Sequence, residues 1–183
     1  MKALNPTLWR TCRAVSIPTR LNLLRALFRF HESSVATLAR ETRISEPMAS
    51  IQLRALNSRG LISARPSGKW VFYSDNSNLA IESSAMILEA LRECCAVEMK
   101  NTELIEMATA FTHQRRIAIV KSLDSGSKPL GQLSIATQIP PPSLYRHLAK
   151  LENRKVVLSE GDLYCLALPE NPLGKTLLEI ATS

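Results

Sequence analysis

The sequence predicts a mainly helical chain that carries small β-hairpins as wings and contains two copies of one unit. Two observations support this fold class. Segments with apolar residues at helical spacing alternate with short stretches rich in β-branched and aromatic residues. The order of four helices, a hairpin and a further helix then occurs a second time along the chain. We therefore expect two domains, over residues 1–98 and 99–183.

The segment Ser45–Tyr73 holds the most informative pattern of the first copy. Ser45 suits the N-cap of a helix, because its hydroxyl oxygen accepts a hydrogen bond from the first turn, and Pro47 suits that turn because it lacks an N–H. Gly60 favours the end of the helix, since glycine adopts left-handed dihedral angles at little cost. The segment then predicts two short strands and a turn, at Leu61–Arg65, Trp70–Tyr73 and Pro66-Ser67-Gly68. A helix that leads into a basic-tipped hairpin is typical of the DNA-reading half of a winged helix-turn-helix.

This segment resembles the ArsR-type winged-helix repressors. The runs that carry the resemblance are Ser50-Ile51-Gln52-Leu53-Arg54-Ala55-Leu56, Gly60-Leu61-Ile62 and Gly68-Lys69-Trp70-Val71-Phe72-Tyr73. In that family a Ser-x-His-Leu-x-x-Leu recognition helix leads to a Gly-Leu-Val strand and a Gly-x-x-x-x-Tyr wing. Gln52 stands where the family usually has histidine. The resemblance implies a sequence-specific DNA-binding transcriptional regulator, with repression as the expected mode of action.

The same pattern recurs at a nearly constant offset. Leu148 and Leu151 lie 95 positions after Leu53 and Leu56, and Arg116 lies 96 positions after Arg20. Because helices that precede the motif also match, we interpret the chain as a tandem duplication of two winged helix-turn-helix domains. In the ArsR-type fold the first and last helices pair two protomers. The resemblance therefore implies a single-chain pseudo-dimer, with an ordinary homodimer as the alternative.

The remaining elements are predicted from apolar spacing and from capping residues. In the first copy we expect further helices over Asn5–Val15, Pro18–Phe30, Ser34–Thr42 and Ala80–Val97. In the second copy we expect helices over Glu103–Thr112, Gln114–Leu123, Leu130–Thr137, Pro140–Asn153 and Asn171–Ala181, and wing strands over Val156–Glu160 and Leu163–Leu168. Three consecutive prolines at 140–142 define the start of the second recognition helix, because proline fits only the first turn.

Outward side chains of the recognition helices and the wings are the candidate DNA contacts. Gln52 suits a bidentate bond to adenine and Ile51 suits a thymine methyl, whereas arginine and lysine suit phosphates. In the first copy the expected contacts are Ser45, Glu46, Ser50, Ile51, Gln52, Arg54, Arg59, Arg65 and Lys69. In the second copy they are Ser143, Tyr145, Arg146, His147 and Lys150. The alternative interpretation is that the charged residues form a solvated surface.

The two copies differ at the wing. Arg65 and Lys69 flank the first turn, whereas Glu160 and Asp162 flank the second and would repel phosphate. We therefore expect the first domain to be the stronger DNA-binding unit. Two unlike recognition helices also predict unlike half-sites and hence an asymmetric operator in double-stranded DNA.

Charge and composition agree with this function. The net charge is +7, from 23 lysine and arginine against 16 aspartate and glutamate residues, which favours a polyanionic partner. No apolar run approaches the roughly 20 residues of a membrane helix, and the first residues lack the apolar core of a secretory signal. Four cysteines without a disulfide spacing predict a reducing cytoplasm.

Sensor chemistry and catalysis have little support in the sequence. The third helix has no cysteine and the helix over 80–97 has no histidine, which departs from the metal-sensing members of the resembled family, so we expect no metal and no other cofactor. Cys94 and Cys95, with Cys12 on a helix that packs nearby in that family, suggest a thiol switch, and the alternative is that they fill the core. The chain lacks a nucleophile elbow and a phosphate-binding glycine loop, which predicts that it is not an enzyme.

Two rival functions remain beside a DNA-binding repressor. Winged-helix repeats can serve as a protein-interaction scaffold after DNA binding is lost, and the acidic second wing favours this rival. A repressor gated by an effector between the repeats is the other.

Overall fold

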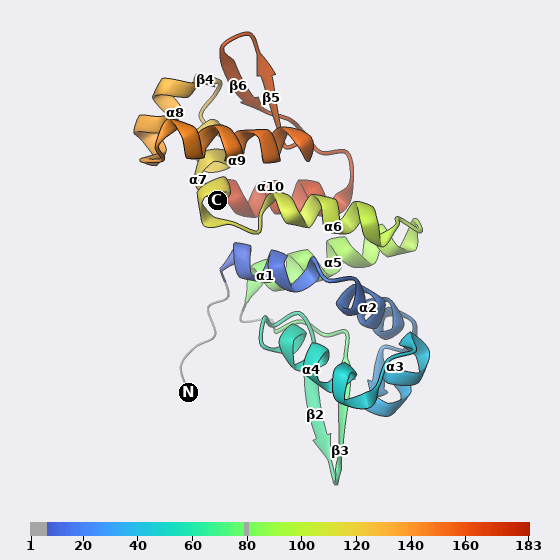
Figure 1. The fold of residues 1–183 in the computed structure, drawn as a ribbon. Coiled ribbons are helices and arrows are strands. Elements are labelled where there is room, and N and C mark those ends of the chain that lie inside the picture. The colour runs from blue at the N-terminus through green and yellow to red at the C-terminus, as the bar shows by residue number, and fades with distance from the viewer. Residues whose placement is uncertain (1–6, 79–80) are drawn as a thin grey trace.

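The computed structural model describes residues 7–78 and 81–183. It contains two helical lobes that each carry a β-hairpin, and the two hairpins point to opposite ends of the molecule (Figure 1). The first lobe has α1 (Leu8–Val15), α2 (Pro18–Phe30), β1 (Glu32–Ser34), α3 (Val35–Thr42), α4 (Glu46–Asn57), β2 (Ser63–Ser67), β3 (Trp70–Ser74) and α5 (Glu82–Ala96). The second has α6 (Asn101–Ala110), α7 (Gln114–Leu123), β4 (Lys128–Pro129), α8 (Leu130–Thr137), α9 (Pro141–Asn153), β5 (Val157–Glu160), β6 (Leu163–Leu166) and α10 (Pro172–Thr182). The predicted helical positions Asn5, Pro6 and Ala80 lie outside the described residues.

The predicted helix starts are confirmed by their caps. Ser45 is the N-cap of α4, and its Oγ accepts a hydrogen bond from Met48 N at 3.4 Å. Ser34 caps α3 in the same way. Asn171 caps α10 through its Oδ1, which accepts from Gly174 N at 2.7 Å. These bonds satisfy N–H groups that a helix leaves unpaired in its first turn.

Each lobe has a three-stranded antiparallel sheet, where the sequence predicted only a hairpin. The strand orders are β1-β3-β2 and β4-β6-β5. The short strands β1 and β4 were not predicted, because two or three residues show no alternation of apolar and polar side chains. They join the helix-turn-helix to the wing, since each pairs with the far strand of the hairpin.

The first wing strand and its turn begin two residues further along the chain than predicted. The strand expected over Leu61–Arg65 lies at Ser63–Ser67, and the turn is formed by Gly68 and Lys69 instead of Pro66-Ser67-Gly68. Leu61 and Ile62 are instead fully buried beneath α4. Asn57 Nδ2 donates to Ile62 O at 2.8 Å and fixes this passage. The burial of these two residues therefore moves the start of the strand.

The same helix contact is repeated in the two lobes. Arg20, at the start of α2, donates from Nη1 to Ala14 O at the end of α1. Arg116, at the start of α7, donates from Nε to Ala110 O at the end of α6. Donor and acceptor are both displaced by 96 positions between the lobes. The duplication is therefore visible in side-chain bonds as well as in the order of elements.

Helices from both lobes pack together at the centre of the molecule. α5 packs against α10 and α1 packs against α6. Buried apolar residues of the two lobes belong to one continuous core. Arg25 Nε also donates to Asn101 Oδ1 at 2.8 Å, and Arg13 Nε donates to Thr112 O at 3.2 Å. Among the described residues, no helix is both long and apolar enough to cross a membrane.

Candidate nucleic-acid interface

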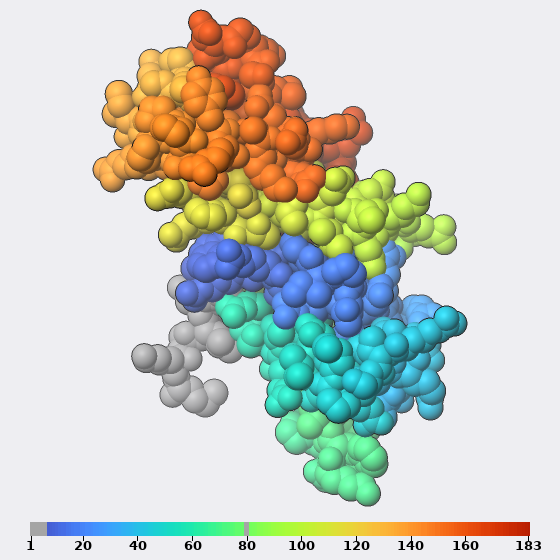
Figure 2. Space-filling model, in the orientation of Figure 1, coloured from blue at the N-terminus to red at the C-terminus, as the bar shows by residue number. Residues whose placement is uncertain are grey.

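Both predicted recognition helices lie at the surface that faces the viewer in Figure 2, α4 in the lower lobe and α9 in the upper lobe. In α4 the inward positions are Ala49, Leu53 and Leu56, which are fully buried as the apolar spacing predicted. Ile51 is 53% exposed, and Arg54 is exposed with its Nε bonded to Ser50 O at 3.2 Å. Of the other predicted contacts, Ser45 and Glu46 are exposed and Ser50 is half-buried. The first turns of α4 therefore present a mixed polar and apolar face that fits a major groove.

Gln52 is more constrained than the sequence suggested. Its Oε1 accepts from Arg20 Nε at 2.7 Å, and its Nε2 lies 3.3 Å from Met48 Sδ. The side chain is half-buried at the edge of α4 that faces α2. A bidentate bond to adenine requires both the oxygen and the nitrogen of the side-chain amide, so Gln52 must first release Arg20. No local sequence pattern indicates this bond, because its partners lie 32 positions apart in the chain.

Arg65 does not lie at the tip of the first wing. Its Nε and Nη2 form a bidentate ion pair with Glu32 on β1, at 3.0 Å each. This pair lowers the pKa of the Glu32 carboxyl, chiefly through its hydrogen bonds with Arg65. Lys69 occupies the turn itself and lies over the Trp70 ring at 5.1 Å from the ring centroid. The cation at the tip is thus Lys69, while Arg65 is held along the strand.

The second recognition helix separates its predicted contacts into two groups. Tyr145 and Arg146 are exposed, and Ser143 and Lys150 are half-buried along the same helix. Arg146 Nη2 lies 3.4 Å from Ser143 Oγ. His147 is instead turned toward the first turn of α7. The helix thus presents fewer free polar groups than the sequence indicated.

His147 packs against His113, the N-cap residue of α7. The ring centroids lie 4.8 Å apart and the planes are tilted by 44°. His113 Nδ1 accepts from Arg115 N, so in this arrangement the ring is neutral with its proton on Nε2. Burial, followed by the surrounding positive charges, lowers the pKa of both histidines. His147 therefore joins α9 to α7, where the sequence suggested a DNA contact.

The second wing presents acidic and apolar groups. Glu160, Gly161 and Asp162 at its tip are exposed. Leu158 and Leu163 on its strands are exposed as well. Such a tip repels a phosphate backbone. The two wings therefore differ in chemistry despite having the same strand order.

A groove rich in arginine lies beside α4 and was not predicted. Trp9, Arg10 and Arg13 of α1 line it together with Arg20 and Arg59, and its volume is about 300 Å³. Arg59 was predicted as a phosphate contact on the helix surface, but it is half-buried and faces this groove. The cluster of basic residues in α1 is the sequence signal that could have indicated this groove.

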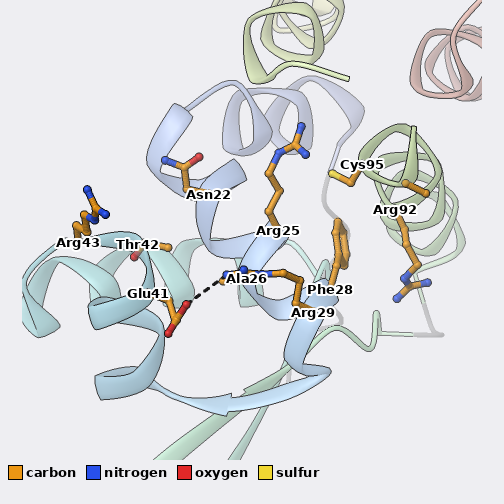
Figure 3. A pocket seen from close by; sticks show the side chains of 11 residues that line it. Asn22, Arg25, Ala26, Phe28, Arg29, Glu41, Thr42, Arg43, Arg92 and Cys95 are labelled. Atoms are coloured by element: carbon orange, nitrogen blue, oxygen red, sulfur yellow. Dashed lines mark hydrogen bonds and ion pairs between the residues drawn. The ribbon is translucent and has the colours of Figure 1, made fainter. Parts of the chain in front are cut away.

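A larger cavity of about 600 Å³ lies between α2, α3 and α5 (Figure 3). Phe28 and Cys95 line it together with four arginines. Three of these arginines already have acceptors: Arg25, Arg29 and Arg92. Arg29 pairs with Glu41 at 3.3 Å, as the dashed line in Figure 3 marks. Arg92 pairs with Asp75. These ion pairs give Arg29 and Arg92 a structural role.

The three cysteines of the hypothesised thiol switch lie on central helices. Cys12 and Cys94 are fully buried and Cys95 is half-buried. Burial raises the pKa of all three thiols. A high pKa keeps a thiol protonated and unreactive, which favours the core-filling alternative. Among the described residues, no three His, Cys, Asp or Glu side chains cluster so that they could hold a metal ion.

These features define the class of protein. Each lobe has three helices, one of which is the recognition helix, and a three-stranded sheet that carries a wing. Because this arrangement occurs twice, the chain is a tandem winged helix-turn-helix protein. The chain matches the family described as "Bacterial regulatory protein, arsR family" over residues 18–64 and again over residues 113–157. Together the two ranges span half of the chain, and the protein belongs to this family. Helix-turn-helix domains of this kind are DNA-binding modules of transcriptional regulators.

Comparison of the chain with curated proteins and with solved structures gave no match.

Proposed function

We propose that the protein is a sequence-specific transcriptional repressor that acts as a single-chain pseudo-dimer. One domain comprises residues 1–98 and the other residues 99–183, and their recognition helices α4 and α9 enter successive major grooves. The observation that carries this proposal is the packing of α5 on α10 and α1 on α6, with α4 and α9 on one face. Repression follows from occupancy of the operator and needs no catalytic step. The protein acts where its DNA is, in the cytoplasm.

The two half-sites should be unlike. Ile51 and Arg54 face outward from α4, whereas Tyr145 and Arg146 face outward from α9. Selection of bound sequences from a random DNA pool tests this directly. We expect an asymmetric site whose two parts lie about 10 base pairs, or one helical turn, apart. A palindromic site would indicate two chains with one active domain each.

Lys69 tests the role of the first wing. Lys69→Ala removes the cation at the tip, so affinity for the selected DNA should fall several-fold and the salt dependence of log K should lose about one unit of slope. Lys175→Ala is the matched control, because Lys175 is exposed on α10 and the substitution removes the same charge. Equal affinities of the two variants, measured by fluorescence anisotropy at several salt concentrations, would refute a DNA-contacting wing.

A protein-interaction scaffold is the second candidate function. The observation in its favour is the second wing, with Glu160 and Asp162 at its tip and exposed Leu158 and Leu163 on its strands. A chain that binds no duplex DNA even at low ionic strength would support this function and contradict repression.

A reporter gene with the selected site over its promoter separates repression from activation, since repression lowers its expression.

A further inference from the structure

The groove beside α4, which we call the arginine groove, has an excess of positive charge. Its lining includes Trp9, Arg10, Arg13, Arg20 and Arg59, and no acidic side chain lies among the described residues that line it. Arg13 and Arg20 each donate to a backbone carbonyl. Among the described residues, neither Arg10 nor Arg59 has an ion pair or a side-chain hydrogen bond. Burial, followed by repulsion from Arg59, lowers the pKa of Arg20. Repulsion of this kind is relieved when an anion enters the groove.

The second lobe shows that the fold does not require this charge. At the position that corresponds to Arg59 stands Arg154, whose Nη1 pairs with Glu106 Oε1 at 2.8 Å and whose Nε donates to Thr109 Oγ1 at 3.0 Å. Glu106 and Thr109 lie 96 positions after Arg10 and Arg13. In the second lobe this contact is therefore neutralised by an ion pair between Arg154 and Glu106. In the first lobe the corresponding residues Arg59 and Arg10 are both positively charged.

We propose that the arginine groove binds a phosphate group. Guanidinium groups form bidentate hydrogen bonds to phosphate oxygens, and Arg10 and Arg59 have all of their donors available. Trp9 supplies an aromatic wall, and the guanidinium groups of Arg10 and Arg13 both lie 5.0 Å from its ring centroid. A phosphate fits the groove better than a carboxylate, because several converging donors match its larger number of acceptor oxygens.

The place of the groove in the fold favours the DNA backbone as the source of this phosphate. α1 lies between α4 and α9 in Figure 1, so DNA that spans both recognition helices passes over it. Arg20 also binds Gln52, which links the groove to a candidate base contact. A free phosphorylated molecule has the same chemistry and is the other source. The first source rests on the proposed function, and the second does not.

Arg10→Glu tests the groove without disturbing the fold, because it reproduces the ion pair that Glu106 and Arg154 form in the second lobe. Lys175→Glu is the control with the same change of charge, and Arg10→Gln is a milder variant. If DNA supplies the phosphate, Arg10→Glu should lower DNA affinity about tenfold more than Lys175→Glu and should reduce the salt slope by about one. Arg10→Gln should have an intermediate effect. Thermal unfolding checks that all three variants remain folded.

The second arm uses pyrophosphate without DNA, at constant ionic strength. The chain has two tryptophans, so Trp70→Phe leaves Trp9 as the only reporter. If the ligand is a free phosphorylated molecule, pyrophosphate should change Trp9 fluorescence with saturation, and Arg10→Glu should abolish that change while its DNA affinity equals that of Lys175→Glu.

The outcomes separate the two proposals. If pyrophosphate has no effect and Arg10→Glu binds DNA as well as Lys175→Glu does, the phosphate site is overturned while DNA binding stands. If the unsubstituted protein binds no DNA, the proposed function fails, and the fluorescence arm alone decides the phosphate site: saturation supports it and no change overturns it.

Discussion

At the scale of single residues, His113 and His147 show how the two copies have diverged at one contact. In the first lobe the recognition helix α4 is joined to α2 by the bond between Arg20 and Gln52. In the second lobe two imidazole rings make the corresponding contact. Arg13, Arg115, Arg116 and Arg146 surround them and contribute to their lowered pKa values. The neutral form of both rings is therefore the form that the fold favours.

This histidine pair predicts a loss of stability in mild acid. In the unfolded chain a histidine has a pKa of about 6.5, and in the folded protein the pKa of each ring is lower. Below about pH 6.5 the unfolded chain consequently binds more protons than the folded protein, so the free energy of unfolding decreases as the pH falls. Urea unfolding at pH 7.5 and pH 5.5 measures the difference.

His147→Gln provides the comparison, since glutamine occupies the corresponding position in the first lobe. The variant should lose less stability between the two pH values than the unsubstituted protein. An identical pH dependence in both proteins would show that the histidine pair is not responsible.

Sequence patterns predicted the role of a residue where the residue and its partner are close together in the chain. The cap at Ser45 needs only its own helix, and it was predicted. The pairs Arg65–Glu32 and Arg20–Gln52 join residues 33 and 32 positions apart, and no local pattern indicates them. The candidate site was therefore predicted as a set of residues, whereas which of them are free to contact DNA required the fold.

At the scale of elements, the link between α4 and the first wing depends on Gly60. This residue has a φ of +71°, and a Cβ added there would lie 2.7 Å from Ile81 Cδ1 and 3.3 Å from Asn78 Cβ. Its left-handed backbone lets the chain leave α4 and pass beneath it into β2. Both backbone and space therefore select glycine at this position.

Gly60→Ala should destabilise the protein by about 1–3 kcal/mol, because it combines an unfavourable dihedral angle with a steric conflict. Gly131→Ala is the control. Gly131 lies in α8, its added Cβ would have no atom within 4 Å, and alanine in a helix should be neutral or stabilising by up to about 1 kcal/mol. Urea unfolding of both variants measures the two effects. Equal stabilities of the two variants would contradict the role assigned to Gly60.

The helices were easier to predict than the sheets. Apolar spacing and caps located the described helices of both lobes to within a few residues. The strands β1 and β4 are too short to show a periodic pattern, and the first wing strand was displaced because Leu61 and Ile62 were assigned to it although they belong to the core. Apolar content alone does not distinguish an edge of the sheet from the core beneath it.

At the scale of the whole molecule, the packing of α1 and α5 on α6 and α10 predicts the state of assembly. These faces are already covered within one chain. We expect sedimentation equilibrium to give a monomer of about 20 kDa, and titration with operator DNA to give one chain per site. A dimer of 40 kDa, or two chains per site, would support the homodimer alternative instead.

The repeat itself was visible in the sequence, because matching residues recur 95 or 96 positions apart. The manner in which the two copies meet was implied only by resemblance to paired protomers. Contacts such as Arg25–Asn101 and Arg13–Thr112 lie outside any repeating pattern and became apparent only in the folded chain.

The covalent connection between the lobes has a consequence for dosage. A regulator assembled from separate subunits loses its active form on dilution, so its response to its own abundance is steep. In the proposed single-chain pseudo-dimer, the second DNA-binding domain is always present at an effective concentration that the chain itself sets. Occupancy of the operator should therefore rise hyperbolically with the concentration of the protein. Each DNA-binding domain can also evolve its own base preference, because no symmetrical counterpart has to change with it.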